Sequence, residues 1–304
     1  QSKEGFIHVR GGRIYYLIHG KSSKAPLLLL HGGPGFPHNG LLPLSDLCND
    51  RGVIFYDQLG CGRSDRPQHD KHWTIAHFVE EISILRRQLE IDKLHLFGHS
   101  WGALLAIEYL LSETEGVLSA TLSSPAIDIP AWVKDSLRLR AELPPEMQLA
   151  LQEGEKTGDF YSANYLAAQS EYYRRHICRI HPLPPELTAA GNASGPEVYN
   201  KMWGPNEFTL TGSLAEVNQG PAIAEISIPL LFTCGRYDEA TPETTHALYE
   251  NAQNAEIEIF EHSSHSAHFE EREAYVKRLR KFLAHAEGGS KSLWQKLLGV
   301  GARS

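Results

Sequence analysis

Short apolar runs alternate along most of the chain with longer segments in which apolar residues recur every third or fourth position. A continuous apolar run predicts a strand buried on both faces of a sheet, and the 3.6-residue spacing predicts a covering helix. The predicted strands are 26–30, 53–56, 93–97, 117–122, 229–234 and 257–260, and the predicted helices are 75–89, 101–111 and 275–283. Two β-rich runs around Gly11-Gly12 predict an initial hairpin. This alternation indicates an α/β fold with a mostly parallel sheet.

The alternation stops between residues 130 and 226. This stretch is rich in helix formers and aromatic residues and is interrupted by prolines, including Pro144-Pro145 and Pro184-Pro185. A helical cap inserted over the carboxyl edge of the sheet is the best account, because ligands bind at that edge. We therefore predict a first part of the α/β core at 1–129, a helical cap at 130–226, a second part of the core at 227–288, and a C-terminal tail at 289–304.

A serine elbow follows the strand at 93–97. Gly98-His99-Ser100-Trp101-Gly102 has the pattern G-x-S-x-G and runs directly into a predicted helix. In such a turn a strained backbone lifts the serine hydroxyl clear of the sheet, and small flanking residues avoid clashes. The helix N-terminus favours the negative charge that develops when an acyl carbonyl is attacked. Ser100 is the predicted nucleophile, although the pattern also occurs in plain strand-turn-helix connections.

Further groups fit acyl-transfer chemistry. His31-Gly32-Gly33-Pro34-Gly35 follows the strand at 26–30 and makes a rigid loop whose backbone can approach a ligand. Although this loop could be merely a turn, the serine elbow favours a second half of an oxyanion hole. The N–H groups of Gly33 and Trp101 would then bind the tetrahedral oxyanion.

Asp238 and His265 complete a predicted catalytic triad. They follow the last two predicted strands, so the chain order is Ser, Asp, His, as in α/β-hydrolases. His265 would take the serine proton, and Asp238 would orient its imidazole. His268 is an alternative base. A metal site at His262, His265 and His268 is disfavoured, because no carboxylate or cysteine stands at a matching spacing. We expect neither a metal nor a cofactor.

The loop at 57–65 contains two glycines and is predicted to have a scaffolding role. Arg63 could hold it by pairing with Asp57 or Asp65. A reactive Cys61 is disfavoured, because nothing in the sequence argues for a lowered thiol pKa.

Composition narrows the function classes. The 29 Lys and Arg residues against 37 Asp and Glu residues give a net charge of −8 without a basic cluster. This excludes a typical nucleic-acid-binding protein. The four cysteines are far apart, which predicts reduced thiols and a cytoplasmic protein.

Neither a signal-peptide core nor a membrane-spanning run is present in the sequence. Whether a segment was removed upstream of Gln1 is left open, since the sequence does not start with a methionine. The tail places several apolar residues on one helical face, which favours a docking helix or an appended remnant over a membrane anchor. These residues are Leu293, Trp294, Leu297 and Leu298.

Six segments together resemble the proline iminopeptidase family of serine aminopeptidases over nearly the whole chain. They are HGGPG at 31–35, YDQLGCGRSD at 56–65, GHSWG at 98–102, GPNEFT at 204–209, GRYDE at 235–239 and SHSAHFEE at 264–271. The resemblance implies an α/β-hydrolase fold and the same triad and oxyanion residues. His99 is a departure, because relatives often carry another residue before the serine.

The resemblance also implies a site for the substrate ammonium group, formed by Glu207, Glu239 and Tyr199. An enzyme that cuts only after the first residue must recognise a free amino terminus, and buried carboxylates do this by charge-assisted hydrogen bonds. In most proteins, glutamate side chains are simply exposed to solvent, and this is the alternative interpretation of both residues. Glu239 resists that interpretation because its neighbour is Asp238, whereas Glu207 rests mainly on the resemblance.

We therefore expect a serine aminopeptidase that releases an N-terminal proline, or another small residue, from short peptides or amino-acid amides through an aminoacyl-enzyme. An amino-acid amidase or a carboxylesterase on the same scaffold stays open, because the first-residue pocket would lie in the variable cap. A non-catalytic receptor of this fold is disfavoured by the complete set of catalytic groups. Epoxide and haloalkane hydrolases are disfavoured because they place Asp where Ser100 stands.

Overall fold

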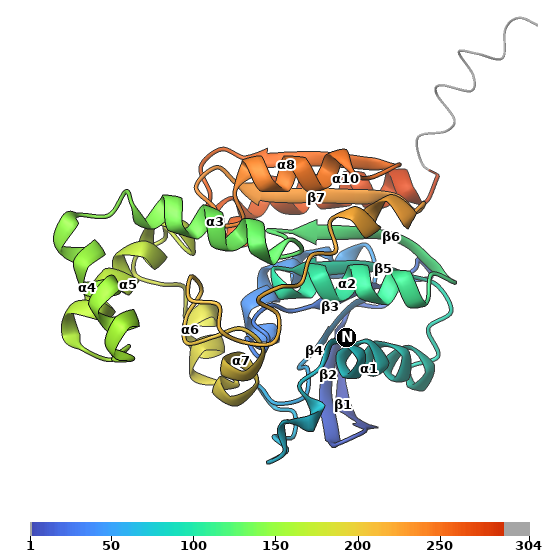
Figure 1. Cartoon of the computed structure of the whole chain (residues 1–304). Coiled ribbons are helices and arrows are strands. Elements are labelled where there is room, and N and C mark those ends of the chain that lie inside the picture. The colour runs from blue at the N-terminus through green and yellow to red at the C-terminus, as the bar shows by residue number, and fades with distance from the viewer. Residues whose placement is uncertain (1, 289–304) are drawn as a thin grey trace, which may run out of the picture.

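The computed structural model describes residues 2–288, which form an eight-stranded sheet with helices on both faces (Figure 1). The strand order is β1-β2-β4-β3-β5-β6-β7-β8, and only the pairs β1/β2 and β2/β4 are antiparallel. The strands are β1 Ser2–Val9, β2 Gly12–His19, β3 Leu27–Leu30, β4 Val53–Tyr56, β5 Leu94–His99, β6 Val117–Ser123, β7 Leu230–Gly235 and β8 Ala255–Phe260. The predicted α/β-hydrolase fold, with its mostly parallel sheet, is confirmed.

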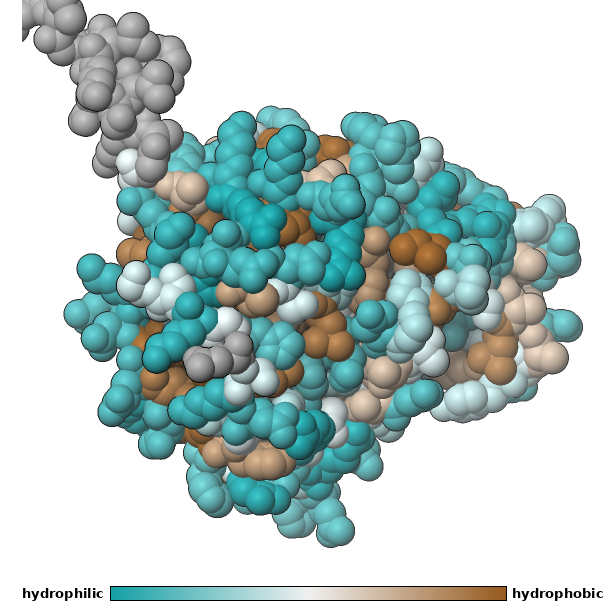
Figure 2. Space-filling model, turned by 180° about the vertical axis from the view of Figure 1, so that it is seen from behind, coloured by the Kyte–Doolittle hydropathy of each residue, from teal (hydrophilic) through white to brown (hydrophobic). Residues whose placement is uncertain are grey.

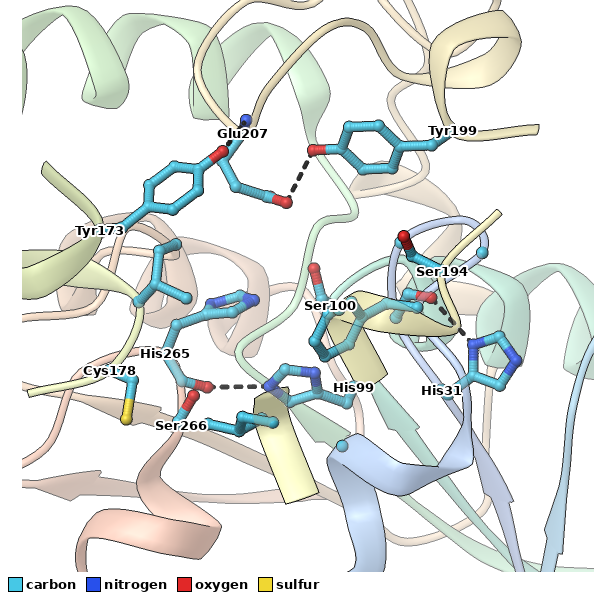
Figure 3. Close-up of a pocket in the computed structure, with 18 of the residues that line it drawn as sticks. His31, His99, Ser100, Tyr173, Cys178, Ser194, Tyr199, Glu207, His265 and Ser266 are labelled. Carbon is cyan, nitrogen blue, oxygen red and sulfur yellow. Dashed lines mark hydrogen bonds between the residues drawn. The ribbon is translucent and has the colours of Figure 1, made fainter. Parts of the chain in front are cut away.

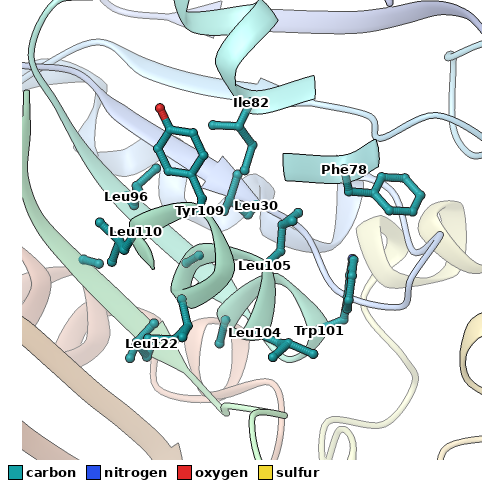
Figure 4. Close-up of a cluster of buried hydrophobic side chains, with 14 of the residues drawn as sticks. Leu30, Phe78, Ile82, Leu96, Trp101, Leu104, Leu105, Tyr109, Leu110 and Leu122 are labelled. Carbon is teal, nitrogen blue, oxygen red and sulfur yellow. The ribbon is translucent and has the colours of Figure 1, made fainter. Parts of the chain in front are cut away.

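The two faces of the sheet are covered by different helices because successive strand residues point in opposite directions. Leu28 and Leu30 of β3 pack in the cluster that contains α1 (Ile75–Gln88) and α2 (Trp101–Ser112). Figure 4 shows Leu30 and its neighbours between these elements. Leu27 and Leu29 belong to the opposite cluster, with apolar residues of α10 (Arg272–Ala286). Burial on both faces explains the uninterrupted apolar runs of the central strands.

Local signals account for several helix boundaries. Thr74 has an extended backbone, and its side chain accepts a hydrogen bond from the backbone N–H of His77, so it caps α1. Pro242 stands in the first turn of α8 (Pro242–Glu250), where its missing N–H costs nothing. Neither α8 nor the 3₁₀ helix η1 (His38–Asn49), which contains an internal proline, is among the elements predicted from the sequence.

Five α-helices lie between β6 and β7, in the segment predicted to form a cap (Figure 1). Prolines begin three of them, so the prolines that interrupt the apolar pattern mark helix starts. The helices are α3 Ile129–Arg140, α4 Pro145–Thr157, α5 Ala163–His176, α6 Pro185–Asn192 and α7 Pro196–Met202, followed by the short 3₁₀ helix η3 Pro221–Glu225. A separate apolar cluster packs α3, α4 and α5 together. The domain boundaries themselves stay a prediction, and the tail predicted at 289–304 lies outside the described residues.

The loop at 57–65 is held differently from the prediction. The Arg63 guanidinium binds Glu4 (3.0 Å), and Asp65 binds Arg13. Only the backbone N–H of Arg63 donates to Asp57 (2.9 Å). The predicted Arg63 side-chain pairs are therefore wrong, because the initial hairpin, which carries Glu4 and Arg13, supplies nearer partners.

The face shown in Figure 2 is mostly hydrophilic, with smaller apolar areas between the polar residues. In the described part of the chain, no helix combines the length and apolar character needed to cross a membrane. Burial raises the pKa of the Cys61 thiol well above its usual value, in agreement with the expectation that Cys61 is unreactive.

Candidate active site

Ser100 stands at the turn between β5 and α2 with a φ of 57° and a ψ of −120°. Few residues other than glycine adopt such a backbone, so the turn is strained. A Cβ atom on Gly98 would collide with the Gly102 carbonyl oxygen, and one on Gly102 would collide with the Leu30 carbonyl oxygen. The backbone N–H of Ser100 donates to the Ser123 carbonyl (2.9 Å). Close packing against β3 and β6 thus fixes the predicted nucleophile at the sheet edge.

Asp238 and His265 come together although 27 positions separate them. The His265 Nδ1–H donates to Asp238 Oδ1 (2.7 Å), which leaves Nε2 unprotonated and able to accept a proton. Burial of His265 opposes its positive charge, but the charge of Asp238 and their hydrogen bond outweigh this, so the pKa of His265 is raised. Figure 3 shows the His265 ring directed toward Ser100, and both residues line one cavity.

Ser124 is a part of this arrangement that the sequence analysis missed. Its hydroxyl donates to Asp238 Oδ2 (2.6 Å), while the backbone N–H of Ala240 donates to Oδ1 (2.8 Å). The Asp238 carboxylate therefore has several donors besides His265, which hold its orientation. Ser124 directly follows β6, and a polar residue at the carboxyl end of a buried strand is the signal that could have identified it.

Two further histidines, His99 and His268, pack beside His265 with tilted or edge-to-face rings. The centroid of the His99 ring lies 4.7 Å from that of the His265 ring and 5.0 Å from that of the His268 ring. Burial, together with the charges of these neighbours, holds the pKa of His99 well below its usual value. Burial lowers the pKa of His268 to about 4, and its Nε2–H donates to the Gly40 carbonyl (2.7 Å). His268 is therefore a poorer proton acceptor than His265.

The histidines at 262, 265 and 268 do not form a metal-binding cluster. One ring nitrogen of His265 is hydrogen-bonded to Asp238, and one ring nitrogen of His268 is hydrogen-bonded to the Gly40 carbonyl. Within residues 2–288, no three His, Cys, Asp or Glu side chains converge in a way that could hold a metal ion.

The predicted oxyanion donors come from two segments, the loop after β3 and the first turn of α2. Gly33 has a φ of +112°, which is accessible to glycine and strained for other residues. Trp101 is the first residue of α2, so its N–H has no partner within the helix. Gly33 lines the cavity together with Ser100, whereas the side chain of Trp101 is buried in the core.

Gln58, which the sequence analysis did not select, connects the two oxyanion segments. Its Nε2 donates to the His31 carbonyl (3.0 Å), and its Oε1 accepts a hydrogen bond from the indole N–H of Trp101 (2.8 Å). Its backbone N–H donates to His31 Nε2 (2.9 Å). All three residues are almost completely buried. Gln58 closely follows β4, so its position at the sheet edge was again a usable signal.

A cavity of about 600 Å³ lies between the sheet edge and the cap. Ser100 and His265 line it from the core, and Tyr173, Tyr199 and Glu207 line it from the cap. This volume falls within the range of about 300–1,000 Å³ that is usual for small-molecule sites. The segment between β6 and β7 thus faces the catalytic groups predicted from the sequence across this cavity.

Glu207 is held in the wall of this cavity by aromatic residues. The Tyr199 hydroxyl donates to Glu207 Oε1 (2.7 Å), and the backbone N–H of Glu207 donates to the Tyr173 hydroxyl (3.3 Å) (Figure 3). The indole N–H groups of Trp132 and Trp203 point at the Glu207 carbonyl, at 3.0 and 3.4 Å. Burial raises the pKa of Glu207, despite the opposing hydrogen bond from Tyr199.

Glu239 is buried, and the structure places it near Glu207 without placing it among the cavity-lining residues. Burial, followed by the charges of Glu207 and Asp238, raises the pKa of Glu239 well above its usual value. Neither carboxyl oxygen of Glu239 has a hydrogen-bond partner within the described chain. An unpartnered buried carboxyl is costly, so this pair is suited to receive a cationic donor.

Comparisons with known proteins agree with this arrangement. Residues 25–272 match a family model described as alpha/beta hydrolase fold. The chain is 39% identical to a proline iminopeptidase from Heyndrickxia coagulans, over 92% of this chain and 98% of that protein.

Two solved structures are similar over the whole fold. The crystal structure of VinJ has a TM-score of 0.91 and 32% identity, with 93% of this chain and 99% of VinJ covered. That of a proline iminopeptidase from Mycobacterium smegmatis has a TM-score of 0.88 and 29% identity, with 95% and 100% covered. The resemblance expected from the six motifs is confirmed. The chain belongs to the α/β-hydrolases and, within them, to the proline iminopeptidase family of serine aminopeptidases.

Proposed function

We propose that this aminopeptidase releases an N-terminal proline, or another small residue, from short peptides. The observation that carries the proposal is the pair of carboxyl groups formed by the half-buried Glu207 and the buried Glu239, close to the triad groups. His265 is near enough to Glu207, and Asp238 to Glu239, for their charges to influence the pKa values of the two glutamates. An ammonium or imino group bound by this pair would bring the first carbonyl of the peptide to Ser100.

In this mechanism Ser100 Oγ attacks the first carbonyl while His265 Nε2 takes the hydroxyl proton. Asp238 stabilises the resulting imidazolium, and the N–H groups of Gly33 and Trp101 bind the oxyanion. His265 then gives the proton to the leaving amine, and an aminoacyl-enzyme remains. A water molecule, deprotonated by His265, attacks this ester and releases the amino acid.

The carboxyl pair accounts for the proposed requirement for a free amine. In the empty site, burial and mutual repulsion oppose full ionisation of both groups. A cationic amine favours ionisation of both carboxyl groups, because it donates charge-assisted hydrogen bonds to the carboxylates. Tyr199 supports the pair by fixing one oxygen of Glu207. The preference for proline is supported by the relatives that carry that activity in their names.

The test of the proposal is hydrolysis of prolyl p-nitroanilide beside its N-acetylated form. We expect the free anilide to be cut and acetylation to lower kcat/KM at least about 100-fold, because a neutral amide would leave the carboxyl pair without a cation. Alanyl and leucyl anilides serve as comparisons for the first side chain. Equal turnover of the blocked compound, or turnover of simple esters alone, would indicate an amidase or a carboxylesterase instead.

Gln58 is a positioning residue in this mechanism, since it sets the distance between the two oxyanion segments. Replacing it with methionine, which has a similar length, should lower kcat about tenfold and change KM little, because only binding of the oxyanion is disturbed. Trp101→Phe removes the indole N–H that Gln58 accepts and should have a similar effect. The double variant should lose little more than either single variant.

Titration of Ser100 with a fluorophosphonate gives the concentration of folded sites, so that a loss of folding is not mistaken for a loss of kcat. Wild-type kcat per titrated site in Gln58→Met would refute the positioning role. Independent, multiplicative losses in the double variant would refute the link through Trp101.

We also propose a reducing, cytoplasmic location. All four cysteines are free, and three of them, Cys61, Cys178 and Cys234, are buried. This usage is typical of proteins that do not depend on disulfide bonds.

A further inference from the structure

The cavity is larger than a single first residue requires, and its remaining part is mostly apolar. Beyond the ammonium site and the triad, its lining includes six apolar side chains that we call the apolar wall: Phe36, Leu41, Ile177, Cys178, Leu183 and Leu187. Three of them are buried even without a ligand: Leu41, Cys178 and Leu187.

The apolar wall lies on the His265 side of the cavity. The backbone N–H of His265 donates to the His176 carbonyl (3.1 Å), which fixes the following residues, Ile177 and Cys178, beside the predicted base. Figure 3 shows Cys178 near Ser266, on the opposite side of His265 from Glu207. Glu207 and the apolar wall thus face different parts of a bound substrate.

Phe36 and Leu187 continue this wall over η1. A Cβ atom added to Gly40 would lie 3.0 Å from the Phe36 ring and 3.9 Å from Leu187, so both side chains close over Gly40. The Gly40 carbonyl in turn accepts the hydrogen bond from His268, whose ring makes an edge-to-face contact with that of His99. Residues of η1, α5 and α6 therefore form one surface next to the catalytic histidine.

This placement assigns the wall to the leaving group. His265 must give its proton to the leaving amine, so the part of the peptide after the cut bond extends along the His265 side. The amine-binding carboxyl pair holds the other end. Resting on the proposed function, we infer that the leaving-group half of the site selects an uncharged, apolar second residue, whose own carboxyl group is part of a further amide bond.

The charges around the wall support this choice. Apart from histidines, the ionisable cationic and acidic side chains that line the cavity in residues 2–288 are Arg174 and Glu207. The Arg174 guanidinium already binds both carboxylate oxygens of Glu171, at 2.8 and 2.7 Å. The free carboxylate of a dipeptide would stand close to the leaving nitrogen without an available cation, and burying an unpaired charge is unfavourable.

The test compares kcat/KM for four substrates: L-prolinamide, prolyl-leucinamide, prolyl-asparaginamide and the free acid prolyl-leucine. Leucine and asparagine side chains are similar in shape, so their comparison isolates polarity. We expect prolyl-leucinamide to exceed prolyl-asparaginamide by about tenfold, because burial of a leucine side chain is worth at least that factor. We also expect it to exceed prolyl-leucine by about tenfold, because the free acid would bring an unpaired carboxylate into the site.

Leu187→Gln should reduce the preference for leucinamide over asparaginamide to less than about threefold, and it should lower prolinamide turnover less than prolyl-leucinamide turnover, because ammonia does not reach the wall. Ile177→Thr, which keeps a β-branched shape, provides a second variant if Leu187→Gln does not fold. Leu137→Gln is the matched control, since Leu137 lies on α3 with 57% of its surface exposed and does not line the cavity.

Equal kcat/KM for the leucine and asparagine amides, or a preference for the free acid, would overturn the inference. So would an equal loss on prolinamide and the dipeptide amides in both wall variants. These results differ from a failure of the proposed function, in which prolinamide and the prolyl amides would not be turned over, or acetylation of their amine would have no effect.

Discussion

Replacing Ser100 with alanine is expected to lower kcat/KM for prolyl p-nitroanilide by at least about 10⁴-fold, because no other group can form the acyl-enzyme. The side chain lines the cavity with His265, and its strained backbone is fixed by Gly98 and Gly102. Alanine fits the same backbone position, so the fold should be retained. The measurement is initial rate against enzyme concentration, together with mass spectrometry after fluorophosphonate treatment.

A matched control for this variant is Ser194→Ala. Ser194 borders the same cavity (Figure 3), and its side chain makes no contact with Asp238 or His265 among the described hydrogen bonds. Its rates should stay within about twofold of those of the unmodified enzyme. Wild-type turnover in Ser100→Ala, or fluorophosphonate labelling at another residue of that variant, would contradict the assignment of the nucleophile.

Glu207→Gln and Glu239→Gln are each expected to lower kcat/KM for free-amine substrates about 100-fold. Removing one charge of a buried pair with a ligand cation typically costs about 2–5 kcal/mol, and each 1.4 kcal/mol is a factor of ten. Glutamine keeps the shape and one acceptor oxygen of the side chain, so the loss isolates the charge. The measurement is kcat/KM for prolyl and alanyl anilides.

The rate of Ser100 labelling by a fluorophosphonate without an amino group distinguishes lost amine binding from a damaged triad. This rate should be unchanged in both variants. Glu243→Gln is the control glutamate, because its side chain is 73% exposed on α8. Unchanged anilide rates in Glu207→Gln and Glu239→Gln would remove the ammonium site, whereas a parallel loss of labelling would place these residues in the support of the triad.

Local sequence patterns were sufficient for most of the sheet. The strands at 53–56 and 117–122 were predicted within one residue of β4 and β6, since a strand buried on both faces must be apolar throughout. The overlooked helices show the limit of this reasoning. In η1 the 3₁₀ geometry and an internal proline weaken the helical spacing.

Side-chain partners could not be predicted in the same way. Arg63 was expected to bind within its own loop, but Glu4 is its partner because β1 and β2 pair with the sheet beside that loop. Ser124 and Gln58 were missed for a related reason. Their functions depend on Asp238 and Trp101, which are 114 and 43 positions away in the chain.

The sequence by itself therefore determined the features that depend on neighbouring residues: the buried strands, the steric demand for glycine around Ser100, and the order of the triad. The tertiary structure decided which distant groups meet. Only the folded chain buries Glu239 beside Glu207 without a hydrogen-bond partner, selects His265 over His268 as the residue that contacts Asp238, and places the apolar wall beside His265. The physical reason is that steric and periodic constraints act along the chain, whereas burial, charge interaction and hydrogen bonding depend on distances that only packing sets.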